Sequence, residues 1–167
     1  MPFIDDLAFL LAFFTSIACG LMGGLFFAFS NFVMRALERI APEAGITAMQ
    51  AINITVMNRI FLGAFLGTTA ACALLVLYAF VHWEVSGTFF LLTGSLLYLL
   101  GNFGVTLFCN VPRNNALAKL DAENPESVAP WRTFVVQWTH WNHVRTGTAL
   151  SASMLLMIGL FLMLAMD

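Results

Sequence analysis

The chain has 167 residues, of which 60% are hydrophobic and only 10% are charged. A soluble domain carries about one quarter charged residues, so this composition excludes an ordinary water-soluble domain and indicates a protein whose main solvent is lipid. The formal net charge of −2, with basic residues confined to two segments, gives no sign of nucleic-acid binding.

Four apolar runs predict four membrane-crossing helices, at residues 7–33, 60–81, 89–109 and 144–166. At about 1.5 Å per residue, each run is long enough to cross a hydrocarbon core of about 30 Å. Small residues at every fourth position of the first run mark a face on which a neighbouring helix can pack. We therefore expect an all-α polytopic membrane protein, with residues 1–167 forming a single membrane domain folded as a compact four-helix bundle.

Two amphipathic stretches favour cytosolic helical extensions before the second and fourth spans. Pro42 suits the first turn of a helix, and an apolar stripe follows it at Ile46, Met49, Ile52, Val56 and Ile60. No helix breaker separates this stripe from the second span, so we expect one uninterrupted helix from the interface into the bilayer. Before the fourth span, a second helical face carries Trp131, Phe134, Val135, Trp138, Trp141 and Asn142.

The distribution of basic residues predicts the topology. All seven lie in the two long connections: Arg35, Arg39 and Arg59 before the second span, and Arg113, Lys119, Arg132 and Arg145 before the fourth. Cytoplasmic loops near membrane spans concentrate Lys and Arg. We therefore expect an integral protein of the bacterial inner membrane, with both long connections in the cytosol and both termini on the non-cytosolic side.

Polar side chains from four segments gather at the cytosolic level of this topology. They include Asn53, Asn58, Asn110, Arg113, Asn114, His140, Asn142, His143 and Arg145. Pro112 removes a backbone donor and frees the carbonyl of Phe108, which protein or a wet cavity must satisfy at membrane depth. Two interpretations stay open: a polar pocket at the cytosolic interface, or a helix that ends there capped by asparagines.

His140 and His143 stand three residues apart and therefore lie side by side on a helix. Imidazole binds zinc, copper and iron, but no Asp, Glu or Cys accompanies the pair, and two ligands make a poor metal site. A general base near neutral pH is the stronger functional interpretation. Two interfacial histidines without a chemical role are the alternative. We assign no metal and no cofactor to the chain.

Four blocks of the sequence resemble the anthrone oxygenase-like family of small four-span membrane proteins, most of which have unknown function. The blocks are residues 20–37 (GLMGGLFFAFSNFVMRAL), 48–58 (AMQAINITVMN), 110–117 (NVPRNNAL) and 138–146 (WTHWNHVRT). The Asn-Val-Pro-x-Asn and Trp-Asn-x-x-Arg-Thr patterns are the most specific parts. The resemblance implies an enzyme that oxidises anthrones to anthraquinones with molecular oxygen and no evident cofactor.

The resemblance also implies roles for the polar residues at the cytosolic level. An anthrone enolate would be stabilised by Arg145 or Arg113, and His140 or His143 would take the benzylic proton. A flat aromatic ligand could stack on the tryptophans and hydrogen-bond through its oxygens. The implied ligand-binding residues are Asn53, Asn58, Asn110, Arg113, Asn114, Trp138, Trp141 and Asn142.

Three functional hypotheses follow. The first is a cofactor-independent oxygenase acting on a lipophilic phenolic or quinone-like compound. The second is a non-catalytic membrane protein that binds or passes such a molecule, and the third is a subunit whose polar patch docks a partner. Expected partners are a lipophilic small molecule and membrane lipid, with a homo-oligomer open. No Asp, Glu, Lys or Arg is predicted deep in a span, which disfavours an ion-coupled pump.

Overall fold

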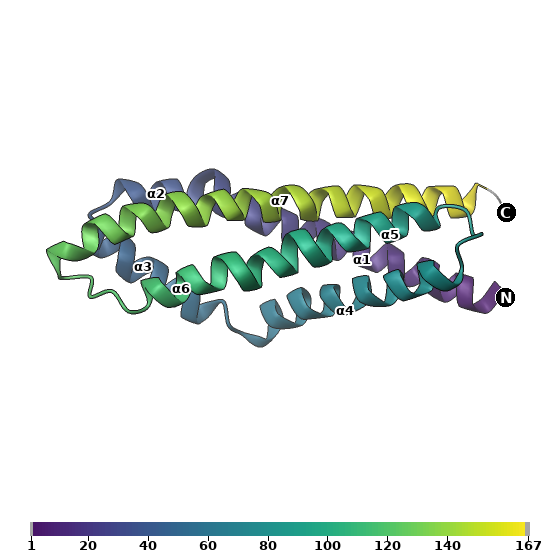
Figure 1. Ribbon diagram of the computed structural model, residues 1–167, viewed down its shortest axis with the longest axis horizontal. Coiled ribbons are helices and arrows are strands. Elements are labelled where there is room, and N and C mark those ends of the chain that lie inside the picture. The colour runs from purple at the N-terminus through teal and green to yellow at the C-terminus, as the bar shows by residue number, and fades with distance from the viewer. Residues whose placement is uncertain (1, 166–167) are drawn as a thin grey trace.

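The computed structural model describes residues 2–165, and within them the chain is helical apart from short connections and contains no β-strand (Figure 1). In chain order the elements are α1 (Pro2–Ala28), η1 (Phe29–Val33), α2 (Met34–Arg39), α3 (Pro42–Thr55), α4 (Arg59–Val81), α5 (Thr88–Leu97), η2 (Tyr98–Gly104), η3 (Thr106–Asn110), α6 (Val111–Leu117), η4 (Pro125–Ser127) and α7 (Val128–Leu164). Segments η1, η2 and η3 are π-helical, and η4 is a 3₁₀ turn. The predicted all-α class is confirmed.

The long helices run alongside one another, with the start of α1 and the end of α7 at the same end of the bundle (Figure 1). The opposite end is formed by α2, α3, α6 and the first half of α7 (Figure 1). Six of the seven basic residues lie in or next to these elements, the first residue of α4 included, and the seventh, Arg145, lies midway along α7. We call this end of the bundle the basic end.

Four helical stretches are long and apolar enough to cross a membrane: Ile4–Arg39, Arg59–Val81, Thr88–Leu117 and Pro125–Leu164. Their outer faces carry large apolar side chains, such as Leu21 at 66% exposure and Phe161 at 70%. An apolar surface of this extent is a liability in water but suits lipid. The four predicted spans are confirmed, and they indicate an integral membrane protein. Met166, where the fourth span was expected to end, lies outside the described residues.

The extension before the fourth span is also present. α7 is a single helix of 37 residues, which at about 1.5 Å per residue is about 55 Å long. A hydrocarbon core is only about 30 Å thick. The first turns of α7 therefore project beyond the membrane at the basic end.

The approach to the second span differs from the predicted uninterrupted helix. α3 ends at Thr55 and α4 begins at Arg59, with Asn58 as the N-cap of α4. The Asn58 side-chain oxygen accepts hydrogen bonds from the backbone N–H groups of Ile60 and Phe61, both at 3.0 Å, and its Nδ2 donates to the Thr55 carbonyl at 3.0 Å. The prediction was wrong because an asparagine can start a helix by capping it, even within an apolar stripe.

An apolar cluster at the basic end holds α2, α3, α6 and α7 together. Its buried members are Met34, Leu37, Ile46, Met49, Leu117, Trp131, Phe134, Val135 and Trp138. Gln50 on α3 adds a polar link, because its Nε2 donates to the carbonyls of Leu117 at 2.9 Å and Leu120 at 3.0 Å. These contacts place α3 beside α6, next to α7.

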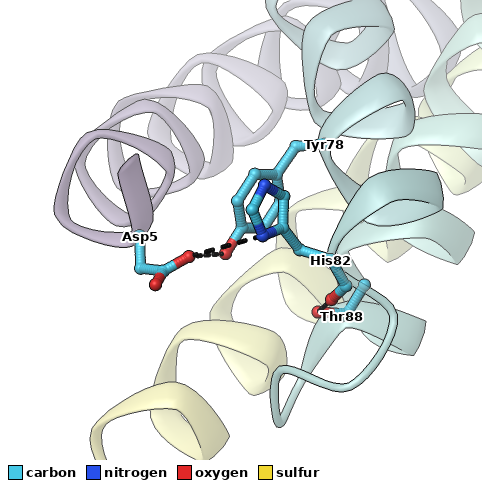
Figure 2. A network of polar contacts seen from close by, with 4 residues as sticks. All are labelled: Asp5, Tyr78, His82 and Thr88. Carbon is cyan, nitrogen blue, oxygen red and sulfur yellow. Dashed lines mark hydrogen bonds and ion pairs between the residues drawn. The ribbon is translucent and has the colours of Figure 1, made fainter. Parts of the chain in front are cut away.

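The other end of the bundle is held by polar contacts between the start of α1 and the end of α4. Figure 2 shows Tyr78 and His82 directed at the same Asp5 carboxylate. The Tyr78 hydroxyl donates to Asp5 Oδ1 at 2.7 Å, and His82 Nδ1 lies 3.9 Å from that oxygen. The Tyr78 and His82 rings stack, and Thr88 Oγ1 donates to the His82 carbonyl at 3.1 Å. This network ties the short loop after α4 to both α1 and α5.

Candidate functional site

Arg145 lies in the interior of α7, and its side chain is only 5% exposed. Its guanidinium carbon lies 3.7 Å from the centroid of the Phe26 ring on α1, a close cation–π contact. Within residues 2–165 no carboxylate pairs with this arginine, and its Nε has no hydrogen-bond partner. A buried cation without a counter-charge costs free energy. The position therefore suits an anionic or electron-rich ligand.

A cavity of about 110 Å³, which we call the Arg145 cavity, lies against this side chain. The aromatic part of its wall is Phe26, Phe29, Phe61 and Trp138. The polar part is Asn53, Thr106, Asn110, Asn114 and Arg145. Val56 and Met57, in the break between α3 and α4, complete one side. A mostly apolar wall with a few converging polar groups is the usual form of a small-molecule site.

Two amides and one indole join α6 and η3 to α7 at this cavity. Trp138 Nε1 donates to Asn114 Oδ1 at 2.8 Å, and Asn110 Nδ2 donates to the Trp138 carbonyl at 3.3 Å. Asn110 is 1% exposed, and its Oδ1 has no partner among the described residues. Buried polar atoms are normally hydrogen-bonded. Asn110 Oδ1 and Arg145 Nε therefore both lack the partner that a buried polar atom normally has, and both belong to residues of the cavity wall.

Two of the π-helical segments, η1 and η3, contribute residues to the cavity wall. Such π-turns inside α-helices occur frequently at functional sites. Pro112 lies in the first turn of α6, directly after η3, and Arg113 Nη1 donates to the Cys109 carbonyl at 2.6 Å. Arg113 thus satisfies a backbone acceptor beside the proline. The helix also continues past Pro112, in place of the helix end expected there.

The structure brings five of the predicted site residues together around the Arg145 cavity: Asn53, Asn110, Asn114, Trp138 and Arg145. They come from three separate parts of the chain: α3, the adjoining η3 and α6, and α7.

The aromatic wall of the cavity was missed in the sequence. Phe26, Phe29 and Phe61 are three of 17 phenylalanines, and in an apolar span nothing in their spacing separates a cavity wall from a lipid-facing side chain.

Four predicted ligand-binding residues do not line the cavity, and each holds helices in place instead. Asn58 caps α4. Asn142 is buried, and its Nδ2 donates to a carbonyl of α1 and a hydroxyl of η1, both at 2.7 Å. Arg113 binds the backbone and Gln137. Trp141 lies beneath Arg113, with the guanidinium carbon 6.0 Å from its ring centroid.

The two histidines lie on another face of α7. His140 and His143 are exposed and line a separate hollow of about 280 Å³, together with Arg35, Glu38 and other residues. The proposed pairing of a histidine base with Arg145 in one cavity is therefore not what the structure shows. In the part of the chain that the structure describes, no group of three or more His, Cys, Asp and Glu side chains is placed to hold a metal ion.

Comparison with known proteins identifies the relatives of this chain. A family model described as anthrone oxygenase matches residues 55–155. The matched range contains most of the residues that line the Arg145 cavity, and it runs from the last residue of α3 to Leu155 within α7. Neither the curated proteins nor the solved structures include a match. Since the family model covers more than half of the chain, the protein belongs to the anthrone oxygenase family.

Proposed function

We propose that the protein binds a planar, lipophilic aromatic molecule in the Arg145 cavity and promotes its oxygenation by molecular oxygen. The observation that carries this proposal is the unpaired, buried guanidinium of Arg145 at the wall of an aromatic-lined cavity. A ligand with an ionisable oxygen would supply the missing negative charge. Phe29, Phe61 and Trp138 would pack against its ring.

The family points to an anthrone-like substrate, and the chemistry suits the cavity. An anthrone loses a proton from its benzylic carbon to give an enolate, whose oxygen Arg145 would stabilise. The enolate transfers one electron to O₂, and the resulting carbon radical and superoxide combine into a peroxide anion. This anion takes back the proton from water to give the hydroperoxide. Loss of water then leaves a new carbonyl, so one oxygen atom enters the quinone and the other leaves as water. This balance needs no further oxidant or reductant.

The proton leaves without help from a side chain of the cavity wall. The described lining residues contain no His, Asp or Glu, so we assign no general base to His140 or His143. Water takes the proton, and Arg145 makes the ionisation more favourable because it stabilises the resulting anion.

A second candidate function is binding or passage of the same class of molecule without turnover. The observation that favours it is the lack of an acid or base among the described lining residues. Both candidates require the ligand to reach Arg145, and only the oxygenase consumes O₂.

Substitution of Arg145 tests the proposal. Arg145→Met keeps much of the side-chain volume but removes the charge, and loss of one stabiliser of a developing oxyanion typically costs on the order of 100-fold in rate. Arg145→Lys keeps the charge but not the planar group that stacks on Phe26, so we expect an intermediate loss. Oxygen consumption and the appearance of quinone absorbance would be measured with a hydroxyanthrone in lipid nanodiscs.

Arg132→Met is the matched control, because Arg132 lies on the same helix but is exposed and outside the cavity. It should leave the rate unchanged. If the wild-type protein binds the hydroxyanthrone without consuming oxygen, the binding function replaces the oxygenase. If Arg145→Met and wild type bind and react equally well, Arg145 has no role in the site and the proposal is wrong.

A further inference from the structure

We propose that a second hollow, between α3 and α6, is the outer half of the ligand site and determines how many fused rings the ligand has. The inference rests on the proposed function. The hollow has a volume of about 390 Å³. It adjoins the Arg145 cavity, because Asn53, Met57, Val111 and Asn114 line both. We call it the α3–α6 hollow.

The Arg145 cavity alone is too small for a fused tricyclic molecule. An apolar cavity of about 150 Å³ takes one benzene, and the Arg145 cavity measures about 110 Å³. It therefore holds at most one ring, with the oxygen substituent of that ring against Arg145. Any further fused ring must extend beyond this cavity, and the α3–α6 hollow lies directly beside it.

The chemistry of the hollow suits the uncharged part of such a ligand. None of its described lining residues is charged. Ile54, Met57 and Val111 offer apolar surface, and the amides of Asn114 and Asn115 can bind hydroxyl substituents. The cation stands at one end of the combined site and neutral side chains stand at the other. A molecule with one ionisable oxygen and an extended neutral ring system matches this division.

The wall between the two spaces can move aside. Met57 is 63% exposed and lies in the break between α3 and α4. A methionine side chain is unbranched and has three rotatable bonds, so it adapts easily to a ligand. At the other end of the hollow, Gln50 fastens α3 to the Leu117 and Leu120 carbonyls. The additional rings therefore lie at the Met57 end, against the Arg145 cavity.

Filling the hollow with a tryptophan tests the inference. Ala118 lines the α3–α6 hollow and is exposed, so Ala118→Trp occupies the space without disturbing the bundle core. Ala116→Trp is the matched control, because Ala116 is also exposed near the end of α6 but lines a different hollow. Dissociation constants would be measured in lipid nanodiscs for 1-hydroxyanthraquinone, which has three rings, and for 2-hydroxyacetophenone, which has one.

We expect Ala118→Trp to weaken binding of the three-ring probe by about 10-fold or more, since overpacking a filled site is strongly unfavourable. The one-ring probe should bind as it does to wild type, and Ala116→Trp should change neither. Asn115→Trp, on the wall of the same hollow, should repeat the pattern of Ala118→Trp.

The outcomes separate this inference from the proposed function. Unchanged three-ring affinity in both Ala118→Trp and Asn115→Trp overturns the role of the hollow while the Arg145 site stands. Equal losses for both probes overturn it too, because the hollow then does not discriminate by ring number. A wild-type protein that binds neither probe overturns the proposed function itself.

Discussion

Arg145 is a buried cation whose charge is only partly compensated by the surrounding protein. The contact with Phe26 contributes about 0.5–2 kcal/mol, whereas burial of an unpaired ion costs several kcal/mol. The ring therefore offsets only part of the cost. An ionisable side chain kept unpaired inside a membrane bundle is a mark of function more often than of stability. A bound anion would restore the balance, which is why ligand binding and fold stability should be coupled at this position.

The histidines provide a prediction at the same scale. His140→Ala and His143→Ala should each leave ligand affinity and any oxygenation rate within about 2-fold of wild type, as for exposed residues outside the site. The reason is that both side chains line a hollow that does not contain Arg145. Ligand-binding titrations and oxygen-consumption assays on both variants would check this. A loss of about 100-fold in either variant would restore that histidine as a general base.

The separation of the histidines from Arg145 could have been predicted from the sequence. At about 100° per residue, His143 and His140 lie about 160° and about 140° from Arg145 around the helix, whereas Trp138 lies only about 20° away. The sequence analysis grouped the histidines with Arg145 because all three lie at the same depth along the membrane normal. Depth alone does not tell which side of the helix each side chain occupies. The role of Asn142 in fastening α7 to α1 and η1 was not accessible in this way, because its partners, Phe26 and Ser30, lie 116 and 112 residues away in the sequence. The role of Asn58 was accessible, because a capping asparagine binds the backbone N–H groups two and three residues ahead of it.

At the scale of elements, the break between α3 and α4 shapes the site. Val56 and Met57 on one side of the break and Phe61 on the other all line the Arg145 cavity. An uninterrupted helix would move these side chains to other positions. Hydropathy predicted the two helices, but the break between them depends on one side chain, Asn58. The apolar periodicity continues across the break and therefore does not reveal it. Apolar periodicity therefore predicts that a helix is present better than it predicts the residue at which the helix ends.

Asn58 gives the prediction at this scale. Asn58→Ala should destabilise the protein by about 0.5–2 kcal/mol, because the backbone N–H groups of Ile60 and Phe61 lose their acceptor. It should also weaken ligand binding, since the break positions cavity residues. Thermal unfolding in detergent and ligand titration would measure both effects.

Asn58→Asp is the matched control, because an aspartate keeps the capping oxygen and loses only the donor to Thr55. It should retain most of the stability. If Asn58→Ala and Asn58→Asp are equally destabilised, the link to Thr55 matters more than the cap, and the explanation of the break is wrong.

At the scale of the whole molecule, the sequence predicted the features that depend on composition alone. Four spans and a helical class follow from apolar runs. The family resemblance follows from four short blocks, of which residues 110–117 and 138–146 lie wholly within the matched range 55–155. The cavity could not be predicted, since its wall draws on seven different elements and on the cluster at the basic end. The gathering of six of the seven basic residues at one end of the bundle, with Arg145 midway along α7, is a property of the sequence and the fold together.

We propose that the basic end faces the cytosol, because Lys and Arg concentrate on that side of membrane proteins. Glu84 and Glu123 are exposed and lie in connections at opposite ends of the bundle. In a variant whose native cysteines, Cys19, Cys72 and Cys109, are replaced, single cysteines at these positions would be treated with a membrane-impermeant maleimide on intact bacterial spheroplasts. Glu84→Cys should react at once, and Glu123→Cys only after the membrane is opened. Reaction of both before lysis would place the two ends on one side and contradict four spans, whereas the reversed pattern would keep the bundle and turn the ligand site to the outer face.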